Sequence, residues 1–235
     1  MVKVLVVSVG GSWQPIINVC KSNKFDYIFF LCSENGKASS SRIVDGEGNP
    51  CVKPPTPITC PKCNEKNNVV CAECGASISK VVHREPSIVA QLRLKADKYE
   101  KITVKDPDDL ELLFSALKKI DTRLQKLFPN QDWSISANYT GGTKTMSVAL
   151  GLMAVLCKWD LLLNIGPRND LVKVKDNDIP MPVPIELIEK VFLLKWVKTL
   201  LDRYDYRAAE ELLTEFMERY KRSNKKGLLD RKSVV

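Results

Sequence analysis

Short, uninterrupted apolar runs alternate along this chain with longer segments of helical periodicity. The first run, residues 3–9, ends at Gly10-Gly11, and the second, residues 26–32, follows an amphipathic stretch over residues 13–21. Strands buried on both faces are continuous apolar runs, and strands that alternate with helices form parallel sheets covered on both sides. The pattern therefore predicts an α/β fold with a doubly wound, Rossmann-like parallel sheet.

The rest of the chain continues the alternation and adds two segments outside it. Residues 107–128 and 142–159 carry apolar side chains that predict one long helix and one largely buried helix. Further strands are expected at residues 101–104, 133–137, 160–165 and 170–174. We predict a core domain over residues 1–176 with an insertion at 51–82, a linker containing Pro180, Pro182 and Pro184, a C-terminal helical pair within 184–222, and a basic tail at 223–235.

The net charge of +8 is concentrated near the C-terminus, where seven Lys or Arg face two acids between Glu218 and Val235. Such a tail is typical of a solvated helix end, and the alternative is a weak, non-specific contact to nucleic acid. The longest uncharged apolar stretch has thirteen residues, too short to span a bilayer, and no signal-peptide cleavage site follows the first run. Cysteines scattered in apolar segments favour a reducing compartment, so we expect a cytoplasmic protein without a membrane partner.

Four cysteines form two CxxC pairs within the insertion: Cys60, Cys63, Cys71 and Cys74. Two residues between the cysteines allow both thiolates of a turn to face one ion, and Gly75 permits the left-handed turn that follows such a pair. Four thiolates suit tetrahedral zinc and leave no open coordination position. We therefore predict a structural zinc ion, with an iron–sulfur cluster or a redox dithiol as the alternatives.

The first glycine loop is Val9-Gly10-Gly11-Ser12-Trp13. Glycines after the first strand of a doubly wound sheet let a phosphate approach the backbone and the next helix. The dinucleotide fingerprint GxGxxG is not met, although Glu34, just past the second strand, keeps an NAD-binding interpretation open. A tight turn from strand to helix is the structural alternative.

The second glycine loop, residues 138–145 (NYTGGTKT), follows a strand and opens an apolar helix. A P-loop needs glycines where Asn138 and Thr143 stand, so a triphosphatase is not favoured. A lysine in the first turn of a helix is unfavourable against the helix dipole unless an anion offsets it. Lys144 therefore indicates a phosphate ligand, and the alternative is a merely exposed lysine.

These features together resemble the CARF domain (CRISPR-associated Rossmann fold) over residues 1–176, apart from the insertion. The resemblance rests on the glycine-serine loop, Ser33-Glu34 after the second strand, the TGGTK sequence followed by Met146, and a "YDYRAA" stretch at residues 204–209. It implies a homodimeric sensor of CRISPR antiviral defence in which a ring of four or six adenylates lies over the dimer interface. The ligand-binding residues it implies are Gly10, Gly11, Ser12, Trp13, Ser33, Asn138, Thr140, Gly141, Gly142, Thr143 and Lys144.

No effector domain is recognisable in the sequence. Relatives with a ribonuclease domain carry an Arg–x4–6–His motif, and the single histidine, His83, does not fit it. We expect a binding module, and the alternative is a metal-independent ring nuclease in which Ser12 and Lys144 are the catalytic candidates. In such an enzyme the 2′-hydroxyl of the nucleotide attacks the adjacent phosphate while the protein holds the geometry and stabilises charge. A regulator that binds nucleic acid through the basic tail is the third hypothesis.

Overall fold

The computed structural model describes residues 1–34, 40–52, 58–60, 62–63, 66–67, 74, 84–166, 168–169, 173–174 and 178–232. Its central element is a six-stranded sheet in the order β12-β9-β8-β1-β2-β7, in which all neighbours are parallel except β12 and β9. The strands are β1 (Val2–Ser8), β2 (Tyr27–Ser33), β7 (Tyr99–Val104), β8 (Trp133–Asn138), β9 (Asp160–Ile165) and β12 (Ile179–Pro182). The predicted doubly wound, Rossmann-like fold is confirmed.

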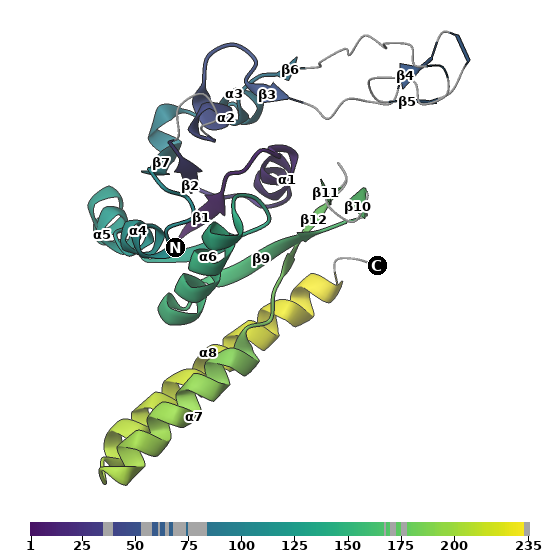
Figure 1. Ribbon diagram of the computed structural model, residues 1–235. Coiled ribbons are helices and arrows are strands. Elements are labelled where there is room, and N and C mark those ends of the chain that lie inside the picture. Colours follow the sequence, from purple (N-terminus) through teal and green to yellow (C-terminus); the bar gives the residue numbers. More distant parts are fainter. Residues whose placement is uncertain are drawn as a thin grey trace. The chain divides into compact units, whose positions relative to one another are not determined.

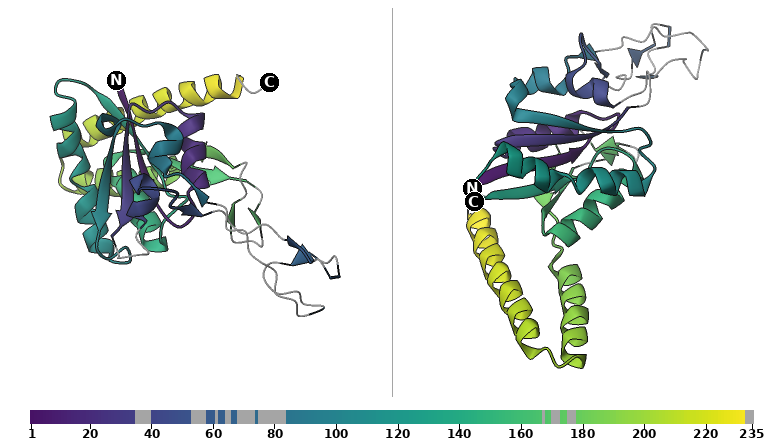
Figure 2. Two further views of the ribbon diagram at one scale, coloured as in Figure 1. Left: turned by 90° about the horizontal axis from the view of Figure 1, so that it is seen from above. Right: turned by 90° about the vertical axis from the view of Figure 1, so that its left-hand side faces the viewer.

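Helices cover both faces of this sheet, as Figure 1 and the right-hand view of Figure 2 show. One face carries α1 (Gln14–Ser22), α2 (Ser41–Asp45) and α3 (Ile88–Leu92), followed by a short 3-10 helix at Ala96–Lys98; the other carries α4 (Leu110–Leu117), α5 (Ile120–Leu127) and α6 (Lys144–Cys157). Only Lys3 is exposed in β1, because both faces of that central strand are covered. The buried runs read from the sequence are thus the inner strands of the sheet.

The single long helix expected over residues 107–128 is two helices in the structure, α4 and α5. Asp109, at the N-cap of α4, accepts a hydrogen bond from the backbone of Leu112 at 3.0 Å. Between the helices the backbone N–H of Lys119 donates to Ala116, three residues back, which tightens the turn. Leu113, Leu117, Ile120 and Leu124 are all fully buried. The apolar spacing continues across the break between α4 and α5, so the sequence pattern does not reveal that break.

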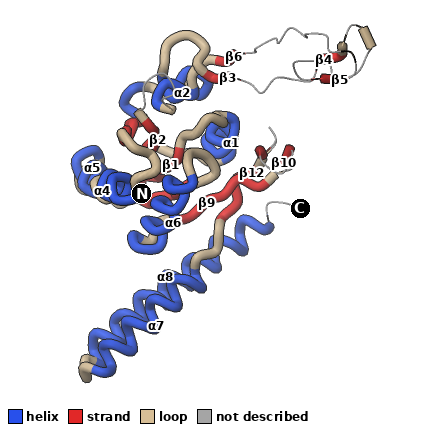
Figure 3. The backbone as a smooth tube through the Cα atoms, in the orientation of Figure 1, coloured by secondary structure: helices blue, strands red, loops and turns tan. Residues whose placement is uncertain are grey.

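The segment expected to be a proline linker instead contains the edge strand β12. Of the strand expected at 170–174, only residues 173–174 are described, and they pair outside the central sheet. Pro180 and Pro182 lie opposite Asn164 and Leu162 of β9. Proline is tolerated at a sheet edge, where its missing N–H would face away from the ladder. A separate two-stranded ladder joins β10 (Arg168–Asn169) to β11 (Lys173–Val174). The edge strand is easy to distinguish in the tube view of Figure 3.

The insertion begins and ends on a two-stranded antiparallel ladder. β3 (Cys51–Val52) pairs with β6 (Arg84–Glu85), with Cys51 opposite Glu85. Within the insertion β4 (Ile58–Thr59) pairs with β5 (Lys66–Asn67). The ladder therefore closes the base of the insertion, near the expected bounds of 51 and 82.

A second compact unit begins at Val183 and consists of α7 (Glu186–Asp202) and α8 (Tyr206–Lys232). The helical pair was expected, but α8 continues through ten residues that were expected to be tail. Asp205 accepts from the backbone of Ala208 at 3.1 Å, as a helix N-cap does. Among the described residues no helix combines the length and apolar character needed to cross a membrane.

Candidate functional site

The two glycine loops meet at the carboxyl edge of the sheet. β1 and β8 are parallel neighbours with Val7 opposite Asn138, so the loops that follow them leave the sheet side by side. In open α/β sheets this edge is where ligands bind. Loops far apart in the sequence are thereby joined into one surface.

Contact between the loops is backbone against backbone. A Cβ atom on Gly10 would lie 2.5 Å from the backbone nitrogen of Gly142, and one on Gly141 would lie 2.7 Å from the carbonyl oxygen of Ser8. Gly142 has a φ of 79°, in the left-handed region that favours glycine. Gly10, Gly141 and Gly142 are therefore required for the loops to interlock, whatever they bind.

Two hydroxyl groups hold the second loop and the start of α6. The Oγ of Ser8 donates to the carbonyl oxygen of Gly141 at 2.7 Å. Thr143 is the N-cap of α6: its Oγ1 accepts from the backbone of Met146 at 3.2 Å and donates to the carbonyl oxygen of Pro107 at 2.8 Å. The N-terminal turn of this fourteen-residue helix thus faces the junction of the loops. Such a turn offers backbone N–H groups and a partial positive charge to an anion.

The predicted ligand residues divide by exposure. Gly11, Ser12, Gly142 and Lys144 are exposed, whereas Trp13 and Asn138 are buried. Trp13 packs in the core cluster on the α1 face of the sheet. Gly10, Ser33, Thr140, Gly141 and Thr143 are partly buried. The open part of the site therefore combines loop backbone, the Ser12 hydroxyl and the Lys144 ammonium.

Ser33 lies on the neighbouring strand and is tied to the start of α2. Its backbone N–H donates to the Oγ of Ser40 at 2.8 Å, and the two hydroxyl oxygens are 3.2 Å apart. The serine predicted from the second strand is thus at the same carboxyl edge, with its hydroxyl engaged by the protein.

Below the second loop lies a buried hydrogen-bond network that the sequence analysis did not identify. Asn138 and Asn164 are 1% and 2% exposed, and their side chains are joined by a bond of 2.7 Å from Nδ2 to Oδ1. Asn164 in turn donates to Asp178 at 2.6 Å, and Asp178 also accepts from Asn18 of α1. The signal was present, since Asn164 interrupts the apolar run of β9.

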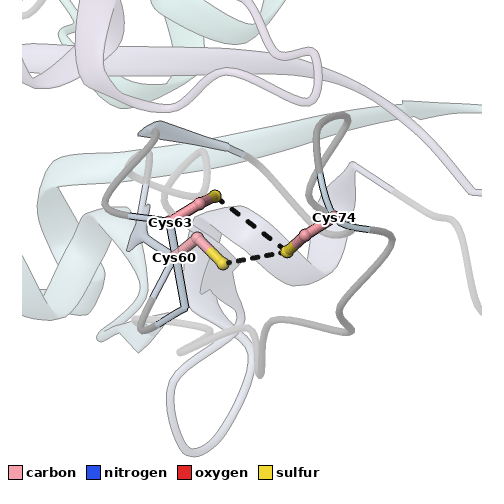
Figure 4. A group of neighbouring side chains, drawn as sticks. All are labelled: Cys60, Cys63 and Cys74. Carbon is pink, nitrogen blue, oxygen red and sulfur yellow. Dashed lines mark hydrogen bonds between the residues drawn. The ribbon is translucent and has the colours of Figure 1, made fainter.

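Three of the four predicted metal ligands are close together, as Figure 4 shows: the sulfur atoms of Cys60, Cys63 and Cys74 all lie within 4.8 Å of one another. The sulfurs of Cys60 and Cys74 are 3.6 Å apart, and those of Cys63 and Cys74 4.0 Å. Two thiolates bound to one tetrahedral zinc at about 2.3 Å would lie about 3.8 Å apart. This cluster can hold a metal ion. Cys71, the fourth predicted ligand, lies outside the described residues.

Hydrogen bonds from the backbone of Lys62 and then of Cys63 lower the pKa of the Cys60 thiol to about 6. The lowered pKa favours the thiolate form, which is the form that binds metals. In contrast, burial raises the pKa of Cys20 and of Cys32 to about 12, so these two remain neutral thiols in the core.

The single histidine, His83, also lies outside the described residues. A hollow of about 460 Å³ lies along α8, lined by Arg207, Thr214 and the glutamates 210, 211, 215 and 218. Carboxylates disfavour a phosphate ligand, so this hollow is a weaker candidate site than the loops.

Comparison with solved structures shows that the fold is a known one. Csm6 from Enterococcus italicus, solved bound to cyclic hexa-2'-fluoro-hexa-dAMP, matches with a TM-score of 0.56 at 14% sequence identity, over 98% of this chain and 54% of that one. Can2 from Sulfobacillus thermosulfidooxidans, in complex with cyclic tetra-adenylate, matches with a TM-score of 0.37 at 12% identity, over 86% of this chain and 48% of that one. The chain thus spans about half the length of these proteins. No protein-family model matches the sequence, and a search of curated proteins finds no relative.

Proposed function

We propose that this protein is a CARF-type sensor that binds a cyclic oligoadenylate in CRISPR antiviral defence. The observation that carries the proposal is the junction of Gly10 with Gly142 beside the N-terminus of α6 and Lys144. The likeness in fold to Csm6, a protein solved with a cyclic adenylate analogue, supports it.

The chemistry of the exposed groups suits phosphate rather than a neutral ligand. Loop backbone without Cβ atoms allows close approach, and a helix N-terminus stabilises negative charge. Lys144 stands in the first turn of α6, where a cation is unfavourable unless an anion lies nearby. A bound phosphodiester would offset that cost.

The dimer belongs to the same proposal, and one flank of α6 fits it. Val148, Leu152 and Leu156 recur every four residues on this helix and are 51%, 45% and 61% exposed. Exposed apolar stripes of this kind indicate a protein contact. Lys144 precedes Val148 by one further step of four. Pairing two copies through this stripe about a two-fold axis that runs along α6 would bring the two Lys144 loops together, as a two-fold symmetric ring requires.

A glycine in the middle of α6 adds to this argument. A Cβ on Gly151 would meet nothing within 4 Å, so packing inside the chain does not require glycine there. Glycine in a helix costs about 1 kcal/mol relative to alanine. Gly151 lies next to Leu152 and three residues from Val148, so it lets a second helix approach closely.

Titration calorimetry of the purified protein with rings of three, four and six adenylates tests the sensor proposal. We expect one ring per dimer and selectivity for the ring of four or of six. A folded, dimeric protein that binds none of these rings would contradict the proposal.

The second candidate function is cleavage of the bound ring. The exposed Ser12 and Lys144 lie on the two joined loops, as an orienting hydroxyl and a charge-stabilising ammonium would. The ribose 2′-hydroxyl would lose its proton and attack the adjacent phosphorus to form a 2′,3′-cyclic phosphate. The bond from phosphorus to the 5′-oxygen breaks, and the 5′-oxygen takes up a proton, so no net proton is gained or lost. Incubating labelled ring with excess protein and chelator tests this, and an intact ring after hours would reject it.

For the cysteine cluster we propose a structural zinc ion held by Cys60, Cys63, Cys71 and Cys74. The sulfur spacing of the three described members suits zinc, and four thiolates leave no position for a substrate. Its role would be to stabilise an insertion that is too short to hold itself together.

A further inference from the structure

A carboxylate is buried below the second glycine loop, where it accepts hydrogen bonds from neutral amide side chains. Asp178 is 5% exposed and precedes the edge strand β12. Its two oxygens accept hydrogen bonds from the side chains of Asn164 in β9 and Asn18 in α1. Among the described residues, the side chains that donate to this carboxylate are neutral amides, and burying a carboxylate without a cationic partner is costly.

The carboxylate determines which way the amide of Asn164 faces. A carboxylate only accepts, so the Nδ2 of Asn164 must point to Asp178, where it also donates to the carbonyl oxygen of Pro15 at 2.9 Å. The Oδ1 of Asn164 is thereby turned to the second loop, where it accepts from Asn138 at 2.7 Å and from the hydroxyl of Thr140 at 3.3 Å.

The orientation of the Asn164 amide in turn fixes hydrogen bonds to the backbone of the second glycine loop. With its Nδ2 directed to Asn164, Asn138 presents its Oδ1 to the backbone N–H of Thr140 at 3.1 Å. The backbone N–H of Asn164 donates to the Thr140 hydroxyl at 2.8 Å. Both polar groups that Thr140 directs inward are thus engaged, and the turn that leads to Gly141 is held at two points.

We propose that Asn164 and Asp178 are positioning residues that preset the second glycine loop for its ligand. Asn18 extends the same network into α1, the helix that follows the first glycine loop, so one carboxylate connects both halves of the site. Apolar residues of similar volume would fill these positions at lower cost, which favours a role beyond stability. The proposal rests on the proposed function only for the identity of the ligand.

The proposal is tested by exchanging the amide and the carboxylate of the Asn164–Asp178 pair. Asn164→Asp places two acceptors face to face, and Asp178→Asn removes the group that orients Asn164. The double variant Asn164→Asp/Asp178→Asn restores an amide–carboxylate contact in the reverse sense, but it also replaces the hydrogen bond to Pro15 by a carboxylate oxygen that faces the Pro15 carbonyl oxygen. We expect each single variant to weaken ring binding about tenfold and to speed hydrogen exchange of the amides at 140–144 by a similar factor, and the double variant to recover part of both.

Asp45→Asn is the matched control. Asp45 is paired with Lys101 at 2.7 Å with 27% of its side chain exposed, and it lies beside β7 at the opposite edge of the sheet from β12. The Asp45→Asn substitution should lower the melting temperature without changing hydrogen exchange at residues 140–144 or the affinity for the ring. If Asn164→Asp does not fold, Thr140→Val removes a hydroxyl from the same network and replaces it in the test.

The proposal is wrong if the Asp178 variant lowers the melting temperature as Asp45→Asn does, yet leaves ring affinity and exchange at 140–144 unchanged. It is also wrong if the double variant recovers neither. Should the unsubstituted protein bind no ring, the sensor function fails, while exchange at 140–144 still decides whether the network positions the loop.

Discussion

Gly10 lies against Gly142 so closely that even one added carbon atom on Gly10 would stand 2.5 Å from the backbone nitrogen of Gly142. The two glycines belong to loops that follow adjacent parallel strands, β1 and β8. Their contact turns two separate strand-to-helix turns into one surface.

Gly10→Ala should therefore damage both the fold and the site. The atom it meets is backbone and cannot move aside as a flexible side chain would. We expect a loss of about 1–3 kcal/mol in the free energy of unfolding, which corresponds to a fall of about 2–4 °C in melting temperature for each kcal/mol. Thermal melting and ring calorimetry measure the two effects.

The neighbouring substitution Gly11→Ala is the control, because a Cβ there would meet nothing within 4 Å. Its melting temperature should stay within about 2 °C of the unsubstituted protein. Equal destabilisation by both substitutions would show that the contact with Gly142 is not the cause.

Lys144→Met should weaken ring binding by about tenfold to a hundredfold, the loss expected for one hydrogen bond to a charged group. The affinity of the variant should also depend less on salt, because one phosphate contact is removed. Lys126→Met, an exposed lysine at the end of α5, should change neither quantity. Unchanged affinity in Lys144→Met would exclude this lysine from the ligand site.

Gly151→Arg should dissociate the dimer without unfolding the protein. The open space around Gly151 accepts a side chain within one chain, but a charged side chain would block a second α6. Light scattering or sedimentation should give the monomer mass, with a melting temperature close to that of the unsubstituted protein. Ring binding should fall with the loss of the dimer. A variant that remains dimeric would place the interface elsewhere.

Cys63→Ser should lower the zinc content from about one ion per chain, because four thiolates close around one ion and three close less well. The insertion should become more sensitive to proteolysis, while ring binding remains measurable. Cys157→Ser, at the exposed C-terminal end of α6, should leave the zinc content unchanged. Elemental analysis that finds no metal in the unsubstituted protein would contradict the zinc site.

Much of the architecture could be read from local patterns. The run at residues 160–165 is β9 with the same bounds, and the helix expected over residues 142–159 is α6, two residues shorter at each end. Buried strands and amphipathic helices can be predicted from the sequence because burial imposes a regular spacing on their apolar side chains. The break between α4 and α5 leaves that spacing intact, so it was invisible.

The sequence by itself determined the class of fold, the glycines that the loops require and the cysteines that can gather around an ion. Each of these depends on residue type and on spacing over a few positions. Only the tertiary structure decided that Pro180 and Pro182 belong to a strand, that Trp13 and Asn138 face inward, and that Asp178 is joined through Asn164 to the second loop. These outcomes depend on which distant segments meet, and a hydrogen bond between residues far apart in the sequence leaves no periodic trace in it.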